Sequence, residues 1–197
     1  MEPRSTRDDA RVADAERFAK EVLPAVSRTF ALSIRLLPGA LGRAVRTAYL
    51  LCRIADTIED EPRMPASEKA ILFDELQRCF DDPAAADAFP QLLGDLQGRP
   101  ADVRLAMHAD LVFALYRSLA STTQAHVRRW VGEMIVGMRK FVLLYPHGIR
   151  ISFGDVSGLL SVDRSESSYG SALRTEAGGD IAFRFPIQDQ EGASSPL

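Results

Sequence analysis

The sequence predicts an all-α protein over its first 151 residues, and three observations support this. Apolar residues recur at helical spacing, no stretch before residue 150 alternates as a strand does, and prolines stand where helices would begin or end. Of the 197 residues, 46% are hydrophobic and 26% are charged, which is typical of a globular protein with a substantial core. The net charge of −3 argues against nucleic acid as a partner.

Three helices are expected in the N-terminal third of the chain. The first spans residues 10–26, and the second spans residues 31–37 with Ser27 as its cap. A long central helix follows between Pro38 and Pro62, because proline fits the first turn of a helix and cannot continue a regular one.

The next segments alternate between helix and connector. A helix begins at Ser67, residues 81–100 form a connector with at most a weak helix, and another helix spans residues 102–119. The residues expected to face inward from the two helices are Ile71, Leu72, Leu76, Phe80, Val103, Met107, Leu111 and Leu115.

The clearest amphipathic helix spans residues 122–145, with Ser121 and Gln124 at capping-box spacing. Gly137 interrupts its apolar face, at a cost of about 1 kcal/mol relative to alanine. Either a neighbouring helix packs closely there or a ligand approaches, and close helix packing is the favoured alternative. The predicted inward residues are Val127, Trp130, Val131, Met134, Ile135, Met138, Phe141, Val142 and Tyr145.

The composition changes after Ile151. Residues 152–197 contain nine serines and six glycines without a helical period, and only residues 181–185 suggest a short strand. We therefore expect a helical domain over residues 1–151 and a divergent Ser/Gly-rich tail over 152–197 that is irregular and disordered. The sequence shows no apolar signal core and no membrane span, and its two cysteines read as reduced core thiols, so a cytoplasmic location is predicted.

A polar stripe on the central helix is the most informative feature for function. At 100° per residue, Tyr49, Arg53, Asp56 and Asp60 fall within an arc of about 60°. The apolar residues around the stripe predict a helix that is buried nearly all round, where unpaired charge is costly.

The acids of the stripe crowd the negative end of the helix dipole, which destabilises the helix unless a cation lies between them. Oxygen ligands without histidine or cysteine favour Mg²⁺ at Asp56 and Asp60, and Arg53 would suit the other side of a diphosphate. The alternative is a solvated acidic helix end, which is what most acidic runs are.

Four sequence pieces together resemble the squalene/phytoene synthase family, the head-to-head prenyl synthases. They are Ser27-Arg-Thr-Phe-Ala-Leu-Ser, Leu36-Leu-Pro38, the stripe through Asp56-Thr-Ile-Glu-Asp60, and Gly137-Met-Arg-Lys-Phe. The resemblance covers about residues 17–151 and looks more like the squalene-forming branch. It implies the front half of an isoprenoid-synthase-type helical bundle.

The resemblance also implies an activity and its residues. Members join two prenyl diphosphates such as farnesyl diphosphate, with Mg²⁺, and the squalene-forming enzymes use NADPH. Asp56 and Asp60 match the motif that holds the metal, while Tyr49 and Arg53 match catalytic residues that contact diphosphate. The remaining substrate-binding matches are Ser27, Arg28, Phe30 and Gly137, and a product this apolar implies peripheral contact with a membrane surface.

The departure from the family is as informative as the match. The family needs a second aspartate-rich motif on a later helix. The tail offers the aspartates Asp155, Asp163, Asp180 and Asp189, and none of them has a carboxylate four residues on. Two alternatives to an active enzyme therefore stay open: a truncated or frame-shifted inactive fragment, and a non-catalytic helical interaction module.

Overall fold

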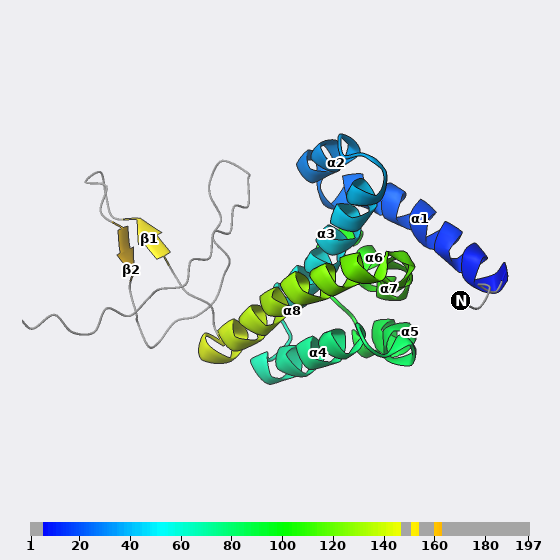
Figure 1. Cartoon of the computed structure of the whole chain (residues 1–197). Helices are drawn as coiled ribbons and strands as arrows, with labels where there is room; N and C mark the ends of the chain where they lie inside the picture. Colours follow the sequence, from blue (N-terminus) through cyan, green and yellow to red (C-terminus); the bar gives the residue numbers. More distant parts are fainter. Residues whose placement is uncertain (1–5, 147–150, 154–159, 163–197) are drawn as a thin grey trace, which may run out of the picture. The chain divides into compact units, whose positions relative to one another are not determined.

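The computed structural model describes residues 6–146, 151–153 and 160–162. The chain divides into two units, residues 1–146 and 147–197, each of which is described by itself. The first unit is entirely helical where it is described, which confirms the predicted all-α class (Figure 1). Its helices are α1 (Thr6–Val26), α2 (Arg28–Arg35), α3 (Gly39–Glu59), α4 (Ala66–Arg78), α5 (Pro83–Leu92), α6 (Pro100–Ala106), α7 (Ala109–Ser118) and α8 (Ser121–Leu144).

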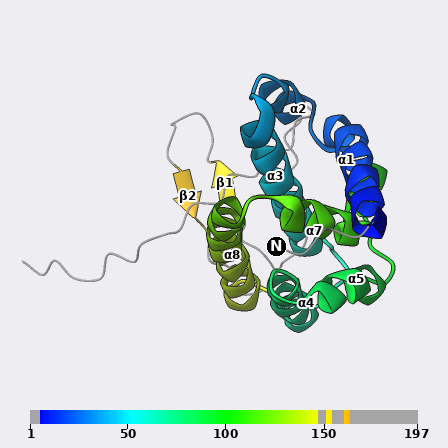
Figure 2. The ribbon, with the colours of Figure 1, turned by 45° about the vertical axis from the view of Figure 1, so that its right-hand side comes forward.

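Helix α3 is the centre of this unit. It packs against α1, α2, α4, α6, α7 and α8, and Figure 2 shows the other helices arranged around it. The apolar residues flanking the polar stripe are buried as predicted, which fixes how α3 is rotated in the bundle. These residues are Leu50, Leu51, Ile54, Ala55 and Ile58.

Two segments differ from the predicted helix pattern. The expected connector contains α5, whose first turn Asp82 caps. The helix expected over 102–119 breaks into α6 and α7, because the His108 ring hydrogen-bonds to the Arg104 carbonyl oxygen (2.8 Å) and stacks on Phe18 (centroids 4.9 Å apart). A side chain that takes up a backbone acceptor in this way competes with helix continuation.

Three residues predicted to face inward are exposed instead. Ile71 is 63% exposed, Trp130 60% and Met107 39%. The guanidinium of Arg129 lies 4.7 Å from the centroid of the Trp130 ring. The apolar periodicity predicted the correct side of each helix as buried, but it included too many residues in the buried face. Only the residues that meet another helix are buried.

The capping box predicted for α8 is also wrong. The residue at the cap position is Ala120, and Ser121 already belongs to the helix. The amide of Gln124 instead donates to the carbonyl oxygens of Arg117 (3.1 Å) and Leu119 (2.8 Å). Gln124 thereby satisfies acceptors at the end of α7 and links the two helices.

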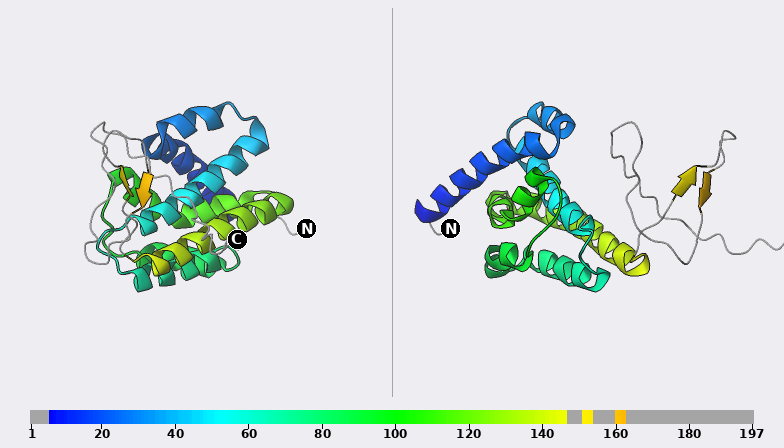
Figure 3. Two further views of the ribbon diagram at one scale, coloured as in Figure 1. Left: turned by 90° about the vertical axis from the view of Figure 1, so that its left-hand side faces the viewer. Right: turned by 180° about the vertical axis from the view of Figure 1, so that it is seen from behind.

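The second unit contains a short antiparallel pair that the sequence pattern did not predict, β1 (Ile151–Phe153) and β2 (Leu160–Val162) (Figure 3). Ile151 pairs with Val162 and Phe153 with Leu160. Strands of three residues are too short for alternation to reveal. The strand suggested at residues 181–185 lies outside the described residues, and so does most of the predicted irregular tail.

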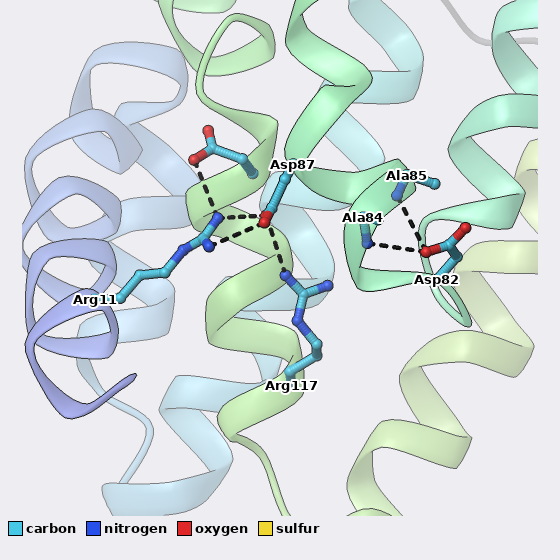
Figure 4. A network of polar contacts seen from close by, with 7 residues as sticks. Arg11, Asp82, Ala84, Ala85, Asp87 and Arg117 are labelled. Carbon is cyan, nitrogen blue, oxygen red and sulfur yellow. Dashed lines mark hydrogen bonds and ion pairs between the residues drawn. The ribbon is translucent and has the colours of Figure 1, made fainter. Parts of the chain in front are cut away.

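Ion pairs and a cap hold α5 in place (Figure 4). The Asp82 carboxylate accepts from the backbone N–H groups of Ala84 (2.9 Å) and Ala85 (3.2 Å). Asp87, further along α5, lies within ion-pair distance of Arg11 on α1 and Arg117 on α7. Three helices that are distant in the sequence thus meet at one carboxylate.

Asp82→Ala is expected to lower the melting temperature near neutral pH, because α5 loses its cap. Hydrogen bonds, first that of the Ala85 N–H, hold the pKa of the Asp82 carboxyl below its usual value. Because the pKa of Asp82 is lower in the native state than in the unfolded state, its carboxylate stabilises the fold at pH values above the unfolded-state pKa of about 3.9. This stabilisation is lost as the pH falls through the native-state pKa. The gap between variant and wild type should therefore shrink in acid.

Thermal melts followed by circular dichroism over a pH series test this expectation. Asp81→Ala is the matched control, because Asp81 lies beside Asp82 and its ion pair within the described residues is with the exposed Arg128. A gap that stays constant down to the lowest pH would contradict the capping role.

Gly42→Ala should destabilise the bundle at the turn between α2 and α3. A Cβ atom at buried Gly42 would lie 2.7 Å from the backbone oxygen of Leu37, so backbone must move, at about 1–3 kcal/mol. Gly137→Ala is the control: no described heavy atom lies within 4 Å of its Cβ position, so helix propensity alone predicts a gain of up to about 1 kcal/mol. Urea unfolding of both variants measures the difference, and equal effects would contradict the steric argument.

Candidate diphosphate-binding site

The polar stripe of α3 lies at the surface of the bundle rather than inside it. Tyr49, Arg53 and Asp56 are half-buried, and Asp60, the residue that caps the helix, is exposed. The expectation that α3 is buried nearly all round is therefore wrong along this stripe. The charged groups can meet solvent or a ligand from one side.

Arg53 is held between carboxylates from two helices. Its guanidinium donates to Asp56 Oδ2 (3.2 Å) and to Asp102 Oδ1 on α6 (2.9 Å). Burial opposes the charged form, but the hydrogen bond and the charge of Asp102 outweigh it, so the pKa of Arg53 is raised. Arg53 is thus a fully charged and oriented group whose Nε has no hydrogen-bond partner among the described residues.

Asp102 is the site residue that sequence reasoning missed. It is buried, and its second oxygen lies 3.7 Å from Arg99 Nε. In the sequence, a single aspartate in the first turn of a short helix indicates only a favourable interaction with the helix dipole. Only the packing of α6 on α3 reveals its pairing with a residue 49 positions earlier.

A lysine compensates the acidic end of α3. Lys69 on α4 donates to the carbonyl oxygen of Glu59. Burial lowers the pKa of Lys69, while the charges of Asp60 and Glu61 act against that shift. The dipole penalty expected for this helix end is therefore reduced within the protein itself.

Glu61, in contrast, has a structural role. It is buried, and its carboxylate accepts from the backbone N–H groups of Arg63 (3.1 Å) and Gln97, so it ties the loop after α3 to the loop before α6. Glu61 thereby differs from the stripe acids, since Asp56 is half-buried and Asp60 is exposed.

The N-terminal motif lies beside the stripe. The ring of Phe30 on α2 stacks on Tyr49 of α3, with centroids 4.6 Å apart and planes 22° apart. Ser27 caps α2 as predicted, its Oγ accepting from the Phe30 backbone N–H (3.3 Å), and Arg28 is exposed in the first turn. The fold thus brings the Ser-Arg-Thr-Phe motif and the stripe together.

Gly137 is not a point of close helix packing. No described heavy atom lies within 4 Å of its Cβ position, so the favoured expectation for this glycine is wrong. The close approach on α8 occurs at Gly132, whose carbonyl oxygen accepts from Gln77 Nε2 (2.7 Å). Gly137 lies on α8, which packs on the stripe helix α3.

The thiol nearest the stripe is inert. Burial, with the charge of Asp56 adding to it, raises the pKa of Cys52 to about 11. Burial likewise raises the pKa of Cys79 to about 12. Both thiols are protonated at neutral pH, as expected for core cysteines.

Within the described residues, no group of three or more His, Cys, Asp or Glu side chains is placed to hold a metal ion. Two cavities of the helical unit, of about 610 and 530 Å³, are lined by residues other than those of the stripe. Asp56 and Asp60 of the stripe thus lie outside both cavities.

Comparison with known proteins settles the family. The squalene/phytoene synthase family model matches residues 23–158, which is most of the chain. The chain belongs to the squalene/phytoene synthase family. The matched region includes the N-terminal motif, the stripe, Asp102 and α8.

Two curated relatives are squalene synthases. Squalene synthase BSS of Botryococcus braunii is 28% identical over 165 residues, which cover 80% of this chain and 34% of that protein. The squalene synthase of Mycosarcoma maydis is 27% identical over 128 residues, covering 64% and 21% respectively. The chain thus spans about a third or less of the length of these relatives.

A solved structure shows the same fold. The structure of TcSQS with the ligand BPH1237 aligns at a TM-score of 0.58 and 26% identity, over 66% of this chain and 36% of TcSQS. The helical unit therefore has the all-α isoprenoid synthase fold, of which it contains a part. None of the described helices is long and apolar enough to span a membrane.

Proposed function

We propose that this protein takes part in the head-to-head condensation of two prenyl diphosphates, with farnesyl diphosphate as the expected substrate. The observation that carries the proposal is the Arg53 guanidinium held between Asp56 and Asp102, beside the Phe30–Tyr49 stack. An oriented cation next to carboxylates and an aromatic face suits an allylic diphosphate, which needs its leaving group stabilised and its carbocation sheltered.

The acidic pair fits Mg²⁺. Asp56 and Asp60 lie one helical turn apart and offer hard oxygen ligands, and Mg²⁺ commonly uses one or two carboxylates plus substrate phosphate oxygens. A bound Mg²⁺ would neutralise the negative charge that develops on the departing diphosphate. Lys69 lies close enough to influence the same end of α3, but its contact is with the Glu59 carbonyl.

The other predicted residues receive distinct roles. Arg53, whose side chain is partly exposed, contributes a positive charge to the diphosphate, and Arg28 adds a second cation from α2. Tyr49 and Phe30 present aromatic faces to the reacting carbon, and Ser27 holds the α2 turn that positions them. Gly137 borders the path of the prenyl tail, where its missing side chain leaves room.

The second candidate is a chain that binds one prenyl diphosphate without condensing two. This candidate is favoured because the described residues supply one acidic pair, on α3. The other acid of the site, Asp102 on α6, forms ion pairs with Arg53 and Arg99. This candidate includes the inactive fragment and the interaction module. NADPH use and peripheral membrane contact belong to the first proposal through the family resemblance, and the proposed cytoplasmic location rests on the two cysteines that read as reduced core thiols.

Two measurements on the full chain separate these candidates. Titration with a non-ionisable thio analogue of farnesyl diphosphate, with and without Mg²⁺, reports binding. Pyrophosphate release from farnesyl diphosphate, with extraction of apolar product in the presence and absence of NADPH, reports condensation. Mg²⁺-dependent binding with product supports the first candidate, and binding without product supports the second. Absence of Mg²⁺-dependent binding would refute the proposed site.

A further inference from the structure

A cavity of about 530 Å³ is lined by residues of α1, α2, α3 and the turn between α2 and α3, and by no residue of the polar stripe. Four of its lining side chains are cations and one is an acid, which leaves an excess of three positive charges in a protein whose net charge is −3. The cations are Lys20 on α1, Arg35 on α2, and Arg43 and Arg46 on α3, and the acid is Glu16 on α1. Three helices thus bring positive charge to one hollow.

The acid in the wall of this cavity is engaged by two of the arginines. Glu16 Oε1 lies 2.7 Å from Arg43 Nε, and Glu16 Oε2 accepts from the Arg46 guanidinium. The Nε atom of Arg46 is buried and has no hydrogen-bond partner among the described residues. The side chains of Lys20 and Arg35 are exposed and form no hydrogen bond or ion pair within the described part of the chain. The cavity therefore offers charged donors that the protein itself does not satisfy.

The dipole of α3 adds to the positive field of the cations. Gly39, the first residue of this 21-residue helix, is part of the cavity wall. The cap residue, Pro38, forms no side-chain hydrogen bond with the first turn, and that turn contains no acid. The N–H groups at the start of a helix carry partial positive charge and attract phosphate groups. This helix end therefore reinforces a site that the four cations already form.

We propose that this cavity binds a diphosphate anion without a metal ion, with free pyrophosphate as its ligand. Lys20 and Arg35 contact the anion, while Arg43 and Arg46 add positive charge and hold Glu16. A diphosphate carries more negative charge than a monophosphate, which suits the excess of cations, and guanidinium groups match the paired oxygens of phosphate groups. The site differs from the stripe, whose acids need Mg²⁺ to meet a diphosphate. It does not depend on the proposed condensation, although pyrophosphate is also the anion which that reaction releases.

Titration calorimetry of the full chain with pyrophosphate, in buffer that contains EDTA and no Mg²⁺, tests the proposal. Pyrophosphate should bind, orthophosphate should bind more weakly, and high salt should weaken both interactions. Because the stripe site requires Mg²⁺, absence of pyrophosphate binding in EDTA would overturn this proposal and leave the proposed function untouched. The thio analogue of farnesyl diphosphate is a second ligand in the same buffer. If it bound more tightly than pyrophosphate, the assignment of the free anion would be overturned.

Two changes in the cavity wall should act in opposite directions. Lys20→Gln/Arg35→Gln should weaken pyrophosphate binding by at least about tenfold, because two charged donors are lost. Glu16→Gln should strengthen binding by about threefold or more, because it removes the acid of the wall and releases Arg43 and Arg46 toward the ligand. A purely structural role of Glu16 predicts no such gain.

The matched control is Arg129→Gln/Lys140→Gln, which removes the same charge from exposed side chains of α8 and should leave pyrophosphate binding unchanged. Circular dichroism melts confirm that each variant is folded. Wild-type affinity in the Lys20/Arg35 variant, or an equal loss in the control, would overturn the proposal. So would a loss of the metal-free binding in Arg53→Gln alone, because pyrophosphate would then occupy the stripe.

Discussion

Asp56→Asn and Asp60→Asn are each expected to lower pyrophosphate release from farnesyl diphosphate by about 100-fold or more, with little change in melting temperature. Each variant removes one negative ligand from the pair proposed to hold Mg²⁺, so the charge on the leaving group is no longer neutralised. Asparagine keeps the size of the side chain. Asp60 is exposed, and the Asp56–Arg53 pair is partly exposed, so the loss of stability should stay below about 1 kcal/mol.

The same variants are informative for a chain that binds without condensing. In that case the Mg²⁺-dependent part of the affinity for the thio analogue should fall at least about tenfold. Asp14→Asn is the matched control, because Asp14 is an exposed α1 acid paired with Arg17 and distant in the sequence from the stripe. Wild-type kinetics and affinity in both stripe variants would refute the metal assignment.

Asp102→Ala is expected to cost about 2 kcal/mol of stability and to weaken diphosphate binding as well. The side chain is 9% exposed and accepts a 2.9 Å hydrogen bond from Arg53, whose own side chain is 24% exposed. Removing one partner of a largely buried ion pair leaves the other charge under-compensated, and the partial exposure of Arg53 moderates the loss. Arg53 should then lean toward Asp56 and lose its orientation for the ligand.

Urea unfolding measures the stability of this variant, and the KM for farnesyl diphosphate, or the Kd of its thio analogue, measures the site. Asp110→Ala is the control, since Asp110 is an acid of α7 whose pair with Arg11 spans 3.5 Å and is more exposed. Its loss should stay below about 1 kcal/mol without an effect on binding. A destabilised Asp102→Ala protein with wild-type ligand affinity would show that Asp102 serves only the fold.

Local patterns were enough to predict most of the helical framework. Apolar spacing and prolines located α3 and the inward faces of α4 and α8, and the Ser27 cap was recognised from its residue type. The failures have physical causes. The break between α6 and α7 depends on a tertiary contact of His108 with Phe18, and the exposure of Trp130 depends on which helices reach α8.

In the candidate site, too, some features could be predicted from local patterns and others depend on tertiary contacts. The stripe was visible because its residues lie on one helix at fixed angular spacing, and the family resemblance linked it to the Ser27–Phe30 motif. The Phe30–Tyr49 stack, the anchoring of Arg53 by Asp102 and the contact of Lys69 with α3 join different helices. No periodicity within one helix carries information about such pairs.

The sequence by itself determined the helical class and the order of acids and cations along α3, because these follow from spacing within single elements. The family was indicated by the resemblance of four motifs in different parts of the chain. The tertiary structure alone decided which charges are paired, that the stripe lies at the surface, and that Arg35 of α2 lines a cavity together with residues of α1 and α3. The reason is that burial and ion pairing are properties of two or more packed elements, and they exist only once the chain has folded.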